Sequence, residues 1–252
     1  MDIKNEYGTL EIQKKYLFLM DKVHKLCVEN GIEYSLCGGS LLGAIRHKGF
    51  IPWDDDMDIS MTRKQYNRFI DCLKKQNTLE IIQDIWVPRI VEKDQDRGVC
   101  IDIFIFDNVP ESDFLNKIKV FALKIVQGMM KAKLSLQNYS FKEKFLVLGT
   151  ALMGKPFTLK FKQKMYSAIS QAGNKRQTEY INTYNDLYKL LGLKYPRQVL
   201  NSYSLTDFDG IQVMVMDGYD KYLKTQYGDY MTPPPAKDRA PQHAAKKDDT
   251  NA

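Results

Sequence analysis

The sequence predicts an α+β fold in which helices and strands alternate first, followed by a helical insert and a carboxy-terminal strand pair. Three observations lead to this prediction: helical spacing of apolar residues near the amino terminus, short alternating segments bounded by turn residues, and a lysine- and leucine-rich stretch after Pro110. With 252 residues, of which 44% are hydrophobic and 27% charged, the chain is long enough to bury a sizeable core.

The first part of the chain is predicted to alternate between helices and strands. Apolar residues recur at helical spacing over 9–30, and Gly31 ends that helix. Residues 32–36 alternate as in a strand, and Pro52 stops a short helix at 41–47 from continuing. The remaining predicted elements are a strand at 57–61, a helix that a capping box opens at Thr62, and strands at 79–85, 87–92 and 99–106.

The second part is predicted to be a helical insert followed by a hairpin. Residues 112–191 have helical periodicity, and strands at 203–208 and 211–216 are joined by Asp209-Gly210, a favoured two-residue turn. The predicted organisation is a catalytic core at 1–110, an insert at 111–200, a hairpin and helix rejoining the core at 201–240, and a disordered tail at 241–252.

The net charge of the chain is +6, and the excess of positive charge is concentrated in the insert. Residues 114–165 hold eleven lysines and a single acid, Glu143, which implies an anionic neighbour. A nucleic-acid partner is not favoured, because the lysines alternate with aliphatic residues and no nucleic-acid motif is present. Two interpretations stay open: a solvated face of a helix bundle, or contact with anionic lipid through the lysines and the interleaved Phe121, Ile125, Val126, Met129 and Met130.

The cysteines and the apolar segments bear on the compartment. Cys27, Cys37, Cys72 and Cys100 lack metal-type spacing and are expected to be reduced thiols, mostly buried. No signal peptide is visible, and no segment reaches the ~18 uninterrupted apolar residues of a spanning helix. We therefore expect a cytoplasmic protein, with a peripheral position at the inner face of the membrane if the insert contacts lipid.

Four aspartates crowd into five positions: Asp54, Asp55, Asp56 and Asp58. In a strand, Asp56 and Asp58 share a face, while Met57 and Ile59 point into the core. Carboxylates so close raise each other's pKa unless a cation neutralises them, and Mg²⁺ favours such oxygen ligands. Asp102, an acid within an apolar strand, would join them if its strand lies alongside. The alternatives are a solvated acidic loop at 54–58 and an ion pair of Asp102 with a buried lysine or arginine.

The glycines that precede these acids in the sequence could form part of a phosphate-binding site. Gly38 and Gly39 close a strand and open a helix, so free N–H groups at the helix start can meet a phosphate, and Ser40 adds a hydroxyl. The cationic triplet Arg46, His47 and Lys48 follows one to two turns later and could counter phosphate charge. Gly-Gly-Ser alone is also a common turn, and His47 fits a structural role at a helix end equally well.

In combination, these motifs resemble a known superfamily. Gly39-Ser40, Asp56-Met57-Asp58 and Asp102 are similar to the three-part signature of DNA polymerase β-like nucleotidyltransferases. More narrowly, GGSLLGAIRHKGFIPWDDDMDISM resembles the hallmark of the LicD family, phosphocholine transferases related to fukutin and fukutin-related protein. IDIFIFDNVP and FDGIQVMVMDGYDKYLKTQYGDYMTPPPAKDR also match, so the resemblance covers about 1–110 and 200–243. The family usually has Gly-Thr at Gly39-Ser40, a change that keeps the hydroxyl.

The resemblance implies a fold and an activity. The fold would be a nucleotidyltransferase-like mixed sheet flanked by helices. The enzyme would transfer phosphocholine from CDP-choline to a sugar hydroxyl of an anionic, lipid-linked cell-surface glycan precursor (teichoic acid, lipopolysaccharide or capsule) and release CMP. The reaction would use one or two Mg²⁺ ions.

The resemblance also implies roles for the residues of the motifs. Asp56, Asp58 and Asp102 would bind the metal, and Asp102 would activate the acceptor hydroxyl. The donor phosphates would lie against Gly38, Gly39, Ser40, Arg46, His47 and Lys48. Asp54 and Asp55 would orient the metal ligands, and Trp53 is the best candidate for the choline ammonium, although aromatic residues are more often part of the core.

Three other functions stay open at this point. The donor could be CDP-ribitol or CDP-glycerol, neither of which needs an aromatic site. The enzyme could transfer the nucleotide itself to a small alcohol. The chain could also be a catalytically idle nucleotide-binding module, although the intact set of Asp56, Asp58 and Asp102 argues against it.

Overall fold

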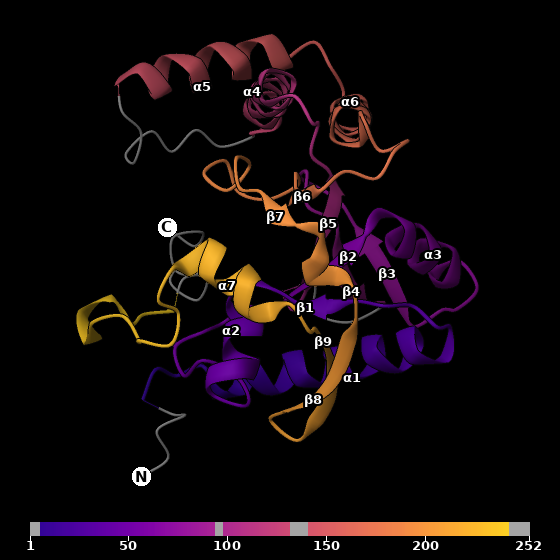
Figure 1. Cartoon of the computed structure of the whole chain (residues 1–252), viewed down its shortest axis with the longest axis vertical. Coiled ribbons are helices and arrows are strands. Elements are labelled where there is room, and N and C mark those ends of the chain that lie inside the picture. Colours follow the sequence, from indigo (N-terminus) through magenta and orange to yellow (C-terminus); the bar gives the residue numbers. More distant parts are fainter. Residues whose placement is uncertain (1–5, 94–97, 132–140, 242–252) are drawn as a thin grey trace. The chain divides into compact units, whose positions relative to one another are not determined.

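The computed structural model describes residues 6–93, 98–131 and 141–241, and in them seven α-helices and nine strands. The α+β class predicted from the sequence is therefore confirmed (Figure 1). The chain divides into two compact units. The first comprises Met1–Ile82, Arg89–Phe104 and Gln198–Ala252, and the second comprises Gln83–Pro88 and Ile105–Arg197. The predicted tail at 241–252 lies outside the described residues from position 242 onward.

The first unit contains the helices that the amino-terminal half predicts. These are α1 (Leu10–Glu29), α2 (Gly38–Arg46) and α3 (Arg63–Leu73), joined by α7 (Tyr219–Tyr227) from the carboxy-terminal part. Helix α1 buries the apolar side that the spacing predicts, and Gly31 follows it with a φ of +59°. The predicted cap of α3 is confirmed, because Thr62 Oγ1 accepts a hydrogen bond from the Gln65 N–H at 3.3 Å.

Five strands of the first unit form a sheet in the order β1-β2-β5-β4-β3. Their bounds are β1 Ser35–Leu36, β2 Asp58–Thr62, β3 Leu79–Ile82, β4 Arg89–Glu92 and β5 Ile101–Asn108, of which β5 continues into the second unit. The pairs β1–β2, β3–β4 and β4–β5 are antiparallel. The Asp102 N–H donates to the Met57 carbonyl at 3.1 Å, so the strand that carries Asp102 lies beside the segment that carries Asp56 and Asp58.

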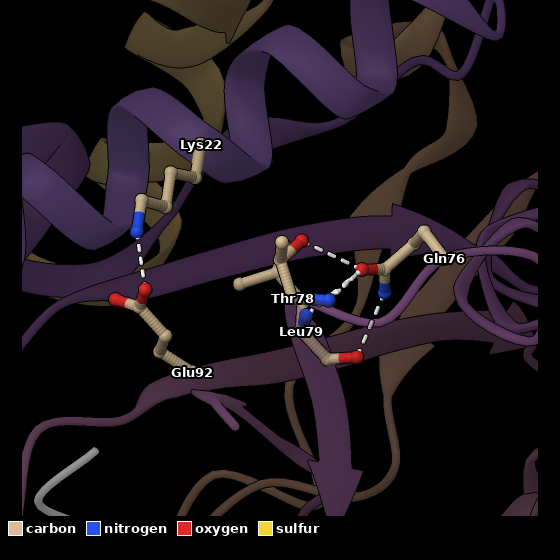
Figure 2. A network of polar contacts seen from close by, with 5 residues as sticks. All are labelled: Lys22, Gln76, Thr78, Leu79 and Glu92. Atoms are coloured by element: carbon tan, nitrogen blue, oxygen red, sulfur yellow. Dashed lines mark hydrogen bonds and ion pairs between the residues drawn. The ribbon is translucent and has the colours of Figure 1, made fainter. Parts of the chain in front are cut away.

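Side chains fix the start of β3 and join α1 to the end of β4 (Figure 2). Gln76 Oε1 accepts hydrogen bonds from the N–H groups of Thr78 (2.5 Å) and Leu79 (2.9 Å), while Gln76 Nε2 donates to the Leu79 carbonyl at 2.7 Å. Lys22 of α1 forms an ion pair with Glu92 of β4. The ion pair of Lys22 with Glu92 helps to hold α1 against the sheet.

The predicted hairpin forms β8 (Tyr203–Phe208) and β9 (Ile211–Met216), a two-stranded sheet of its own. Its turn residues, Asp209 and Gly210, have φ angles of +47° and +87°, as the favoured hairpin turn requires. The hairpin packs on β1 through hydrogen bonds from the Met214 N–H to Tyr34 Oη (3.1 Å) and from the Met216 N–H to Ser35 Oγ (2.9 Å). Its position in the first unit brings residues from the end of the chain to the amino-terminal elements.

The second unit contains α4 (Asp113–Met130), α5 (Phe141–Gly154), α6 (Leu159–Gln171), β6 (Tyr180–Thr183) and β7 (Tyr195–Pro196). Its core gathers apolar side chains from these helices and from the segment that joins β6 to β7, among them Leu123, Val126, Tyr166, Tyr184 and Leu191. The prediction of helix up to residue 191 was wrong, because β6 pairs antiparallel with the end of β5. In the described part of the chain, every helix is too short or too polar to cross a lipid bilayer.

A buried carboxylate, Asp186, lies in this unit. Burial raises the pKa of Asp186 to about 6, although the Leu187 N–H (2.6 Å) and the Thr183 hydroxyl (3.2 Å) both donate to its carboxylate. A carboxyl whose folded pKa lies above its unfolded value of 3.8 is protonated more readily in the folded state. The second unit therefore loses stability as the pH rises from about 4 to about 6.

Asp186→Asn should raise the free energy of unfolding at pH 8 by roughly 2–3 kcal/mol. The amide can still accept from Leu187 and donate to Thr183 Oγ1, and it carries no charge to bury. Urea unfolding at pH 4 and pH 8 measures the effect, and the difference from wild type should nearly vanish at pH 4. A variant that is less stable than wild type by the same amount at pH 4 and at pH 8 would mean that the carboxylate acts only as a hydrogen-bond acceptor.

Candidate active site

The acidic cluster occupies the loop before β2 and the first residue of that strand. Met57 and Ile59 are both fully buried, as the predicted alternation requires. Helix α1 holds the loop: Gln13 Nε2 donates to the carbonyls of Asp54 (2.9 Å) and Ile51 (3.3 Å). The backbone of the acidic loop is thus tied to α1, which argues against a merely solvated acidic loop.

Helix α2 begins at Gly38, three residues earlier than the sequence predicts, so Gly38, Gly39 and Ser40 form its first turn. Gly38 has a φ of +55°, a backbone conformation that residues other than glycine rarely adopt, so glycine is favoured at this position. The first N–H groups of any α-helix lack acceptors within the helix. The Gly38 N–H contacts Tyr222 Oη of α7 at 3.4 Å.

Two carboxylates lie directly against these glycines. A Cβ atom at Gly39 would lie 2.8 Å from Asp54 Oδ2, and one at Gly38 would lie 3.2 Å from Asp58 Oδ2. Ser40 Oγ accepts a hydrogen bond from the Asp58 N–H at 2.9 Å. The hydroxyl therefore positions Asp58, and its contact with a phosphate stays a prediction. The glycine turn and the acids form one site.

Asp54 is a strongly perturbed member of the cluster. Burial is the main cause that raises the pKa of Asp54 well above its usual value, and the charge of Asp56 and a hydrogen bond with Asp56 raise it further. Among the described residues, Asp54 Oδ2 is buried without a hydrogen-bond partner. A buried carboxyl group beside a second carboxyl group occupies a place where a cation could neutralise both charges.

The acids fit a hard divalent cation in charge and in ligand type. In the described part of the chain, no three Asp, Glu, His or Cys side chains gather closely enough to hold a metal ion by themselves. Mg²⁺ does not need such a cage, because one or two carboxylates suffice when substrate phosphates and water complete its shell. The buried oxygen of Asp54 that lacks a hydrogen-bond partner and the neighbouring charge of Asp56 support the fit.

Tyr16 of α1 is a buried tyrosine whose hydroxyl is influenced by the charges of the acids, which the sequence did not indicate. Burial, followed by the charges of Cys100, Asp56, Asp102 and Asp55, raises the pKa of the Tyr16 hydroxyl. Asp56 and Asp102 therefore act electrostatically on a common point inside the first unit. Tyr16 was not distinguishable by sequence, because it follows the same helical spacing as the apolar residues of α1.

A pocket of about 340 Å³ opens beside the acids. Gly39, Arg46, Trp53 and Asp54 line one side of it, and the carboxy-terminal segment from Tyr227 to Ala240 lines the other. Its volume is within the range of small-molecule sites. The pocket thus joins the glycine turn, one acid of the cluster and an aromatic ring in one cavity.

Comparison with known proteins identifies the family. The family described as "LicD/FKTN/FKRP, nucleotidyltransferase domain" matches residues 31–146. The lipopolysaccharide cholinephosphotransferase LicD of Haemophilus influenzae is 33% identical over 262 aligned positions, which cover 92% of this chain and 95% of that protein. The chain belongs to the LicD family. It is therefore a transferase of phosphorus-containing groups.

Two further relatives of this LicD-family chain are uncharacterized proteins. One, from Rickettsia typhi, is 33% identical over 42% of this chain and 37% of its own length. The other, from Rickettsia prowazekii, is 35% identical over 34% of this chain and 31% of its own length. The family match at 31–146 contains all the site residues that the sequence predicts, from Gly38 to Asp102.

Arg239 is a second residue that the sequence did not indicate in this LicD-family site. Its guanidinium lies over the Trp53 ring, 5.2 Å from the centroid, and its Nε donates to the Pro234 carbonyl at 2.9 Å. Arg46 Nη1 donates to the Tyr230 carbonyl at 2.6 Å. Burial and the charge of Arg239 lower the pKa of Arg46. No carboxylate of the described residues forms an ion pair with either guanidinium. Arg46 lines the pocket together with Asp54 and Asp229, whereas Arg239 lies on the ring of Trp53, which lines the pocket.

The other predicted site residues, among them His47, Lys48 and Asp55, differ in their exposure and in their contacts. The ring of His47 lies edge-on to the ring of Trp53, with the two ring centroids 6.4 Å apart. Burial, followed by the charge of Arg46, lowers the pKa of His47. Lys48 is exposed, and its carbonyl accepts a hydrogen bond from the Asp209 N–H at 3.0 Å. Asp55 is buried. The pocket therefore brings together Gly39, Arg46, Trp53 and Asp54, while Lys48 lies outside its lining.

Proposed function

We propose that this LicD-family enzyme transfers phosphocholine from CDP-choline to a sugar hydroxyl of a cell-surface glycan precursor and releases CMP. The support is the 33% identity to the lipopolysaccharide cholinephosphotransferase of Haemophilus influenzae, because the alignment covers nearly all of both chains. That relative favours lipopolysaccharide over teichoic acid or capsule as the acceptor.

The chain's own groups can bind the donor diphosphate. Gly39, in the first turn of α2, and Arg46 both line the pocket beside Asp54, so the Gly39 N–H and the Arg46 guanidinium could bind phosphate oxygens there. Mg²⁺ held by Asp56 and Asp58 would supply charge neutralisation for the diphosphate and for the departing CMP. The close approach of the Asp58 carboxylate to Gly38, and of the Asp54 carboxylate to Gly39, is the structural feature that supports a metal and a diphosphate in the same place.

The reaction is a displacement at the phosphorus that carries choline. The acceptor oxygen forms a bond to this phosphorus, the bond from the phosphorus to the bridging oxygen breaks, and its electron pair leaves with CMP. We assign Asp102 to accept the proton of the acceptor hydroxyl, because its strand lies next to the acidic segment. Arg46 and Arg239 would stabilise the negative charge that develops on CMP.

Trp53 favours choline over ribitol or glycerol as the transferred alcohol. Its ring already has a cation over its face, the guanidinium of Arg239. Aromatic faces bind quaternary ammonium groups through the same attraction. Because Trp53 lines the pocket next to Asp54, a choline group on this ring would be attached to a phosphate within reach of the acids.

Arg239→Gln should lower kcat/KM for CDP-choline about tenfold or more, since a charged partner of the donor phosphates is lost. Steady-state rates of CMP release measure this effect. Arg68→Gln is the matched control, because Arg68 lies on α3 and contacts the Asn30 carbonyl at 2.9 Å, away from the pocket. Equal kinetics of the two variants would remove Arg239 from the donor site.

A panel of donors tests the function itself. The enzyme is incubated with Mg²⁺, an acceptor glycan and CDP-choline, CDP-ribitol or CDP-glycerol, and CMP release and the modified glycan are measured. We expect CMP and a phosphocholine-bearing glycan with CDP-choline only. Turnover of CDP-ribitol or CDP-glycerol alone would contradict the choline assignment. A nucleotidylated acceptor with free phosphocholine would instead support nucleotidyl transfer, which the description of the family domain also suggests.

A further inference from the structure

The first two turns of α4 carry large apolar side chains on their outward face. Phe114 is 71% exposed, Leu115 55%, Ile118 49% and Phe121 57%. Residues three and four positions apart share one face of a helix, so Phe114, Ile118 and Phe121 form a continuous row with Leu115 beside it. We call these four residues the α4 stripe. A row of large apolar side chains in contact with water is typical of an interaction surface.

The rest of α4 explains why the stripe is left uncovered. The second half of the helix lies between other elements: α5 crosses it at Gly128, where a Cβ atom would lie 2.1 Å from Thr150 Oγ1 (Figure 1). Lys162 of α6 donates to the Met129 carbonyl at 2.9 Å. The exposed fractions indicate that no described segment covers the first half in the same way. Helix α4 is thus apolar on two sides, and only one of these sides is packed along its length against other elements of the unit.

The structure changes the set of residues that the sequence suggested for a lipid contact. Val126, Met129 and Met130 are buried in the core of the second unit, and Ile125 is partly buried against it. Of the five apolar residues predicted to lie among the lysines at a membrane, only Phe121 is well exposed. Phe114, Leu115 and Ile118, which the sequence analysis did not select, take their place.

The unit that carries the stripe is rich in exposed lysines. Lys117 is exposed within it, and Lys155, Lys160 and Lys164 are exposed on the α5–α6 part of the same unit. Phe157 and Phe161 are also exposed there and stack at 5.2 Å. Over 114–165 the chain has eleven lysines and one acid. A second copy of the chain is a poor occupant of such a surface, because two copies would bring their lysines together.

We propose that the α4 stripe docks on the surface of an anionic lipid bilayer. The apolar side chains would enter the boundary between headgroups and acyl chains, and the lysines would lie near the headgroup phosphates. This inference goes beyond the proposed function and does not depend on it, since lipid binding requires neither donor nor acceptor.

Sedimentation of the full-length protein with vesicles tests the proposal. We expect binding to vesicles of phosphatidylcholine mixed with phosphatidylglycerol, little binding to phosphatidylcholine alone, and weaker binding as salt is added. The double variant Leu115→Ser/Phe121→Ser should bind at least about tenfold more weakly. Lys117→Gln should bind about fivefold more weakly.

The matched control is Leu205→Ser/Phe18→Ser, which removes a leucine 58% exposed and a phenylalanine 61% exposed from the first unit. It should bind like wild type. Equal losses in the two double variants, or equal binding to neutral and anionic vesicles, would overturn the proposal. So would a lipid-free protein that sediments as a dimer and becomes a monomer in the stripe variant, because the stripe would then be a subunit interface. Thermal unfolding checks that each variant is folded.

Discussion

Asp58→Asn should lower the rate of CMP release from CDP-choline by roughly 10³-fold while the protein stays folded. The asparagine cannot supply the negative charge that would hold a cation at this position, and the cation would in turn bind the diphosphate. The contact that ties β2 to α2 survives, because it is the Asp58 N–H, not its side chain, that donates to Ser40 Oγ. Initial rates at saturating donor and the thermal unfolding midpoint measure the two effects separately.

Asp71→Asn is the matched control for this substitution. Asp71 lies on α3, is exposed and forms an ion pair with Lys74 at 2.8 Å. Its replacement removes the same charge from the same unit and should leave the rate within about twofold of wild type. The stability should also change little, because exposed ion pairs contribute little to stability. A folded Asp58→Asn enzyme with a rate similar to that of the control would remove Asp58 from the mechanism.

Gly39→Ala should lower the rate about 10²-fold without a loss of stability. The new Cβ atom would lie 2.8 Å from Asp54 Oδ2, so the carboxylate must move away from the start of α2. Alanine also has a higher helix propensity than glycine, so the substitution within α2 should not destabilise the helix itself. The predicted result is a folded enzyme with a displaced acid, measured by rates and unfolding midpoints.

Gly192→Ala controls for the loss of a glycine as such, because a Cβ atom at Gly192 would meet nothing within 4 Å. This variant should retain full activity. If Gly39→Ala is as active as Gly192→Ala, the close approach of the acids to the glycine turn has no role in catalysis. Gly38→Ala would be less informative, since its φ of +55° adds backbone strain to the contact with Asp58.

Local sequence signals predicted much of the first unit. Thr62 caps α3 as expected, Asp209-Gly210 forms the hairpin turn, and Met57 and Ile59 point into the core. The neighbourhood of Gly38 and Asp58 was also predictable, because a helix and the next strand are adjacent in both sequence and space. These features depend on residues that lie close together along the chain.

Long-range contacts account for most of what the sequence did not indicate. Tyr222 reaches Gly38 across 184 positions, and Arg239 reaches Trp53 from the last part of the described chain. Spacing alone contains no information about such contacts. The stretch that resembles the LicD family near the carboxy terminus included Arg239, but it did not indicate a role for that residue.

The second unit was harder to predict for two physical reasons. Strand β6 has four residues and is stabilised by pairing with β5, so its own sequence gives a weak local signal. Helix α4 is apolar on more than one side, and its spacing could not tell which side forms the core. The spacing therefore left open whether Val126 and Met129 lie in a helix bundle or contact lipid, and it did not single out the exposed Phe114.

A crystal structure with Mn²⁺ and CDP-choline tests the central claim most directly, because Mn²⁺ can replace Mg²⁺ and gives an anomalous signal. Our account predicts one or two anomalous peaks within ligand distance of Asp56 and Asp58 and of the donor diphosphate, with the diphosphate against Gly38 and Gly39. A donor bound elsewhere, or a peak that neither of these aspartates contacts, would contradict it.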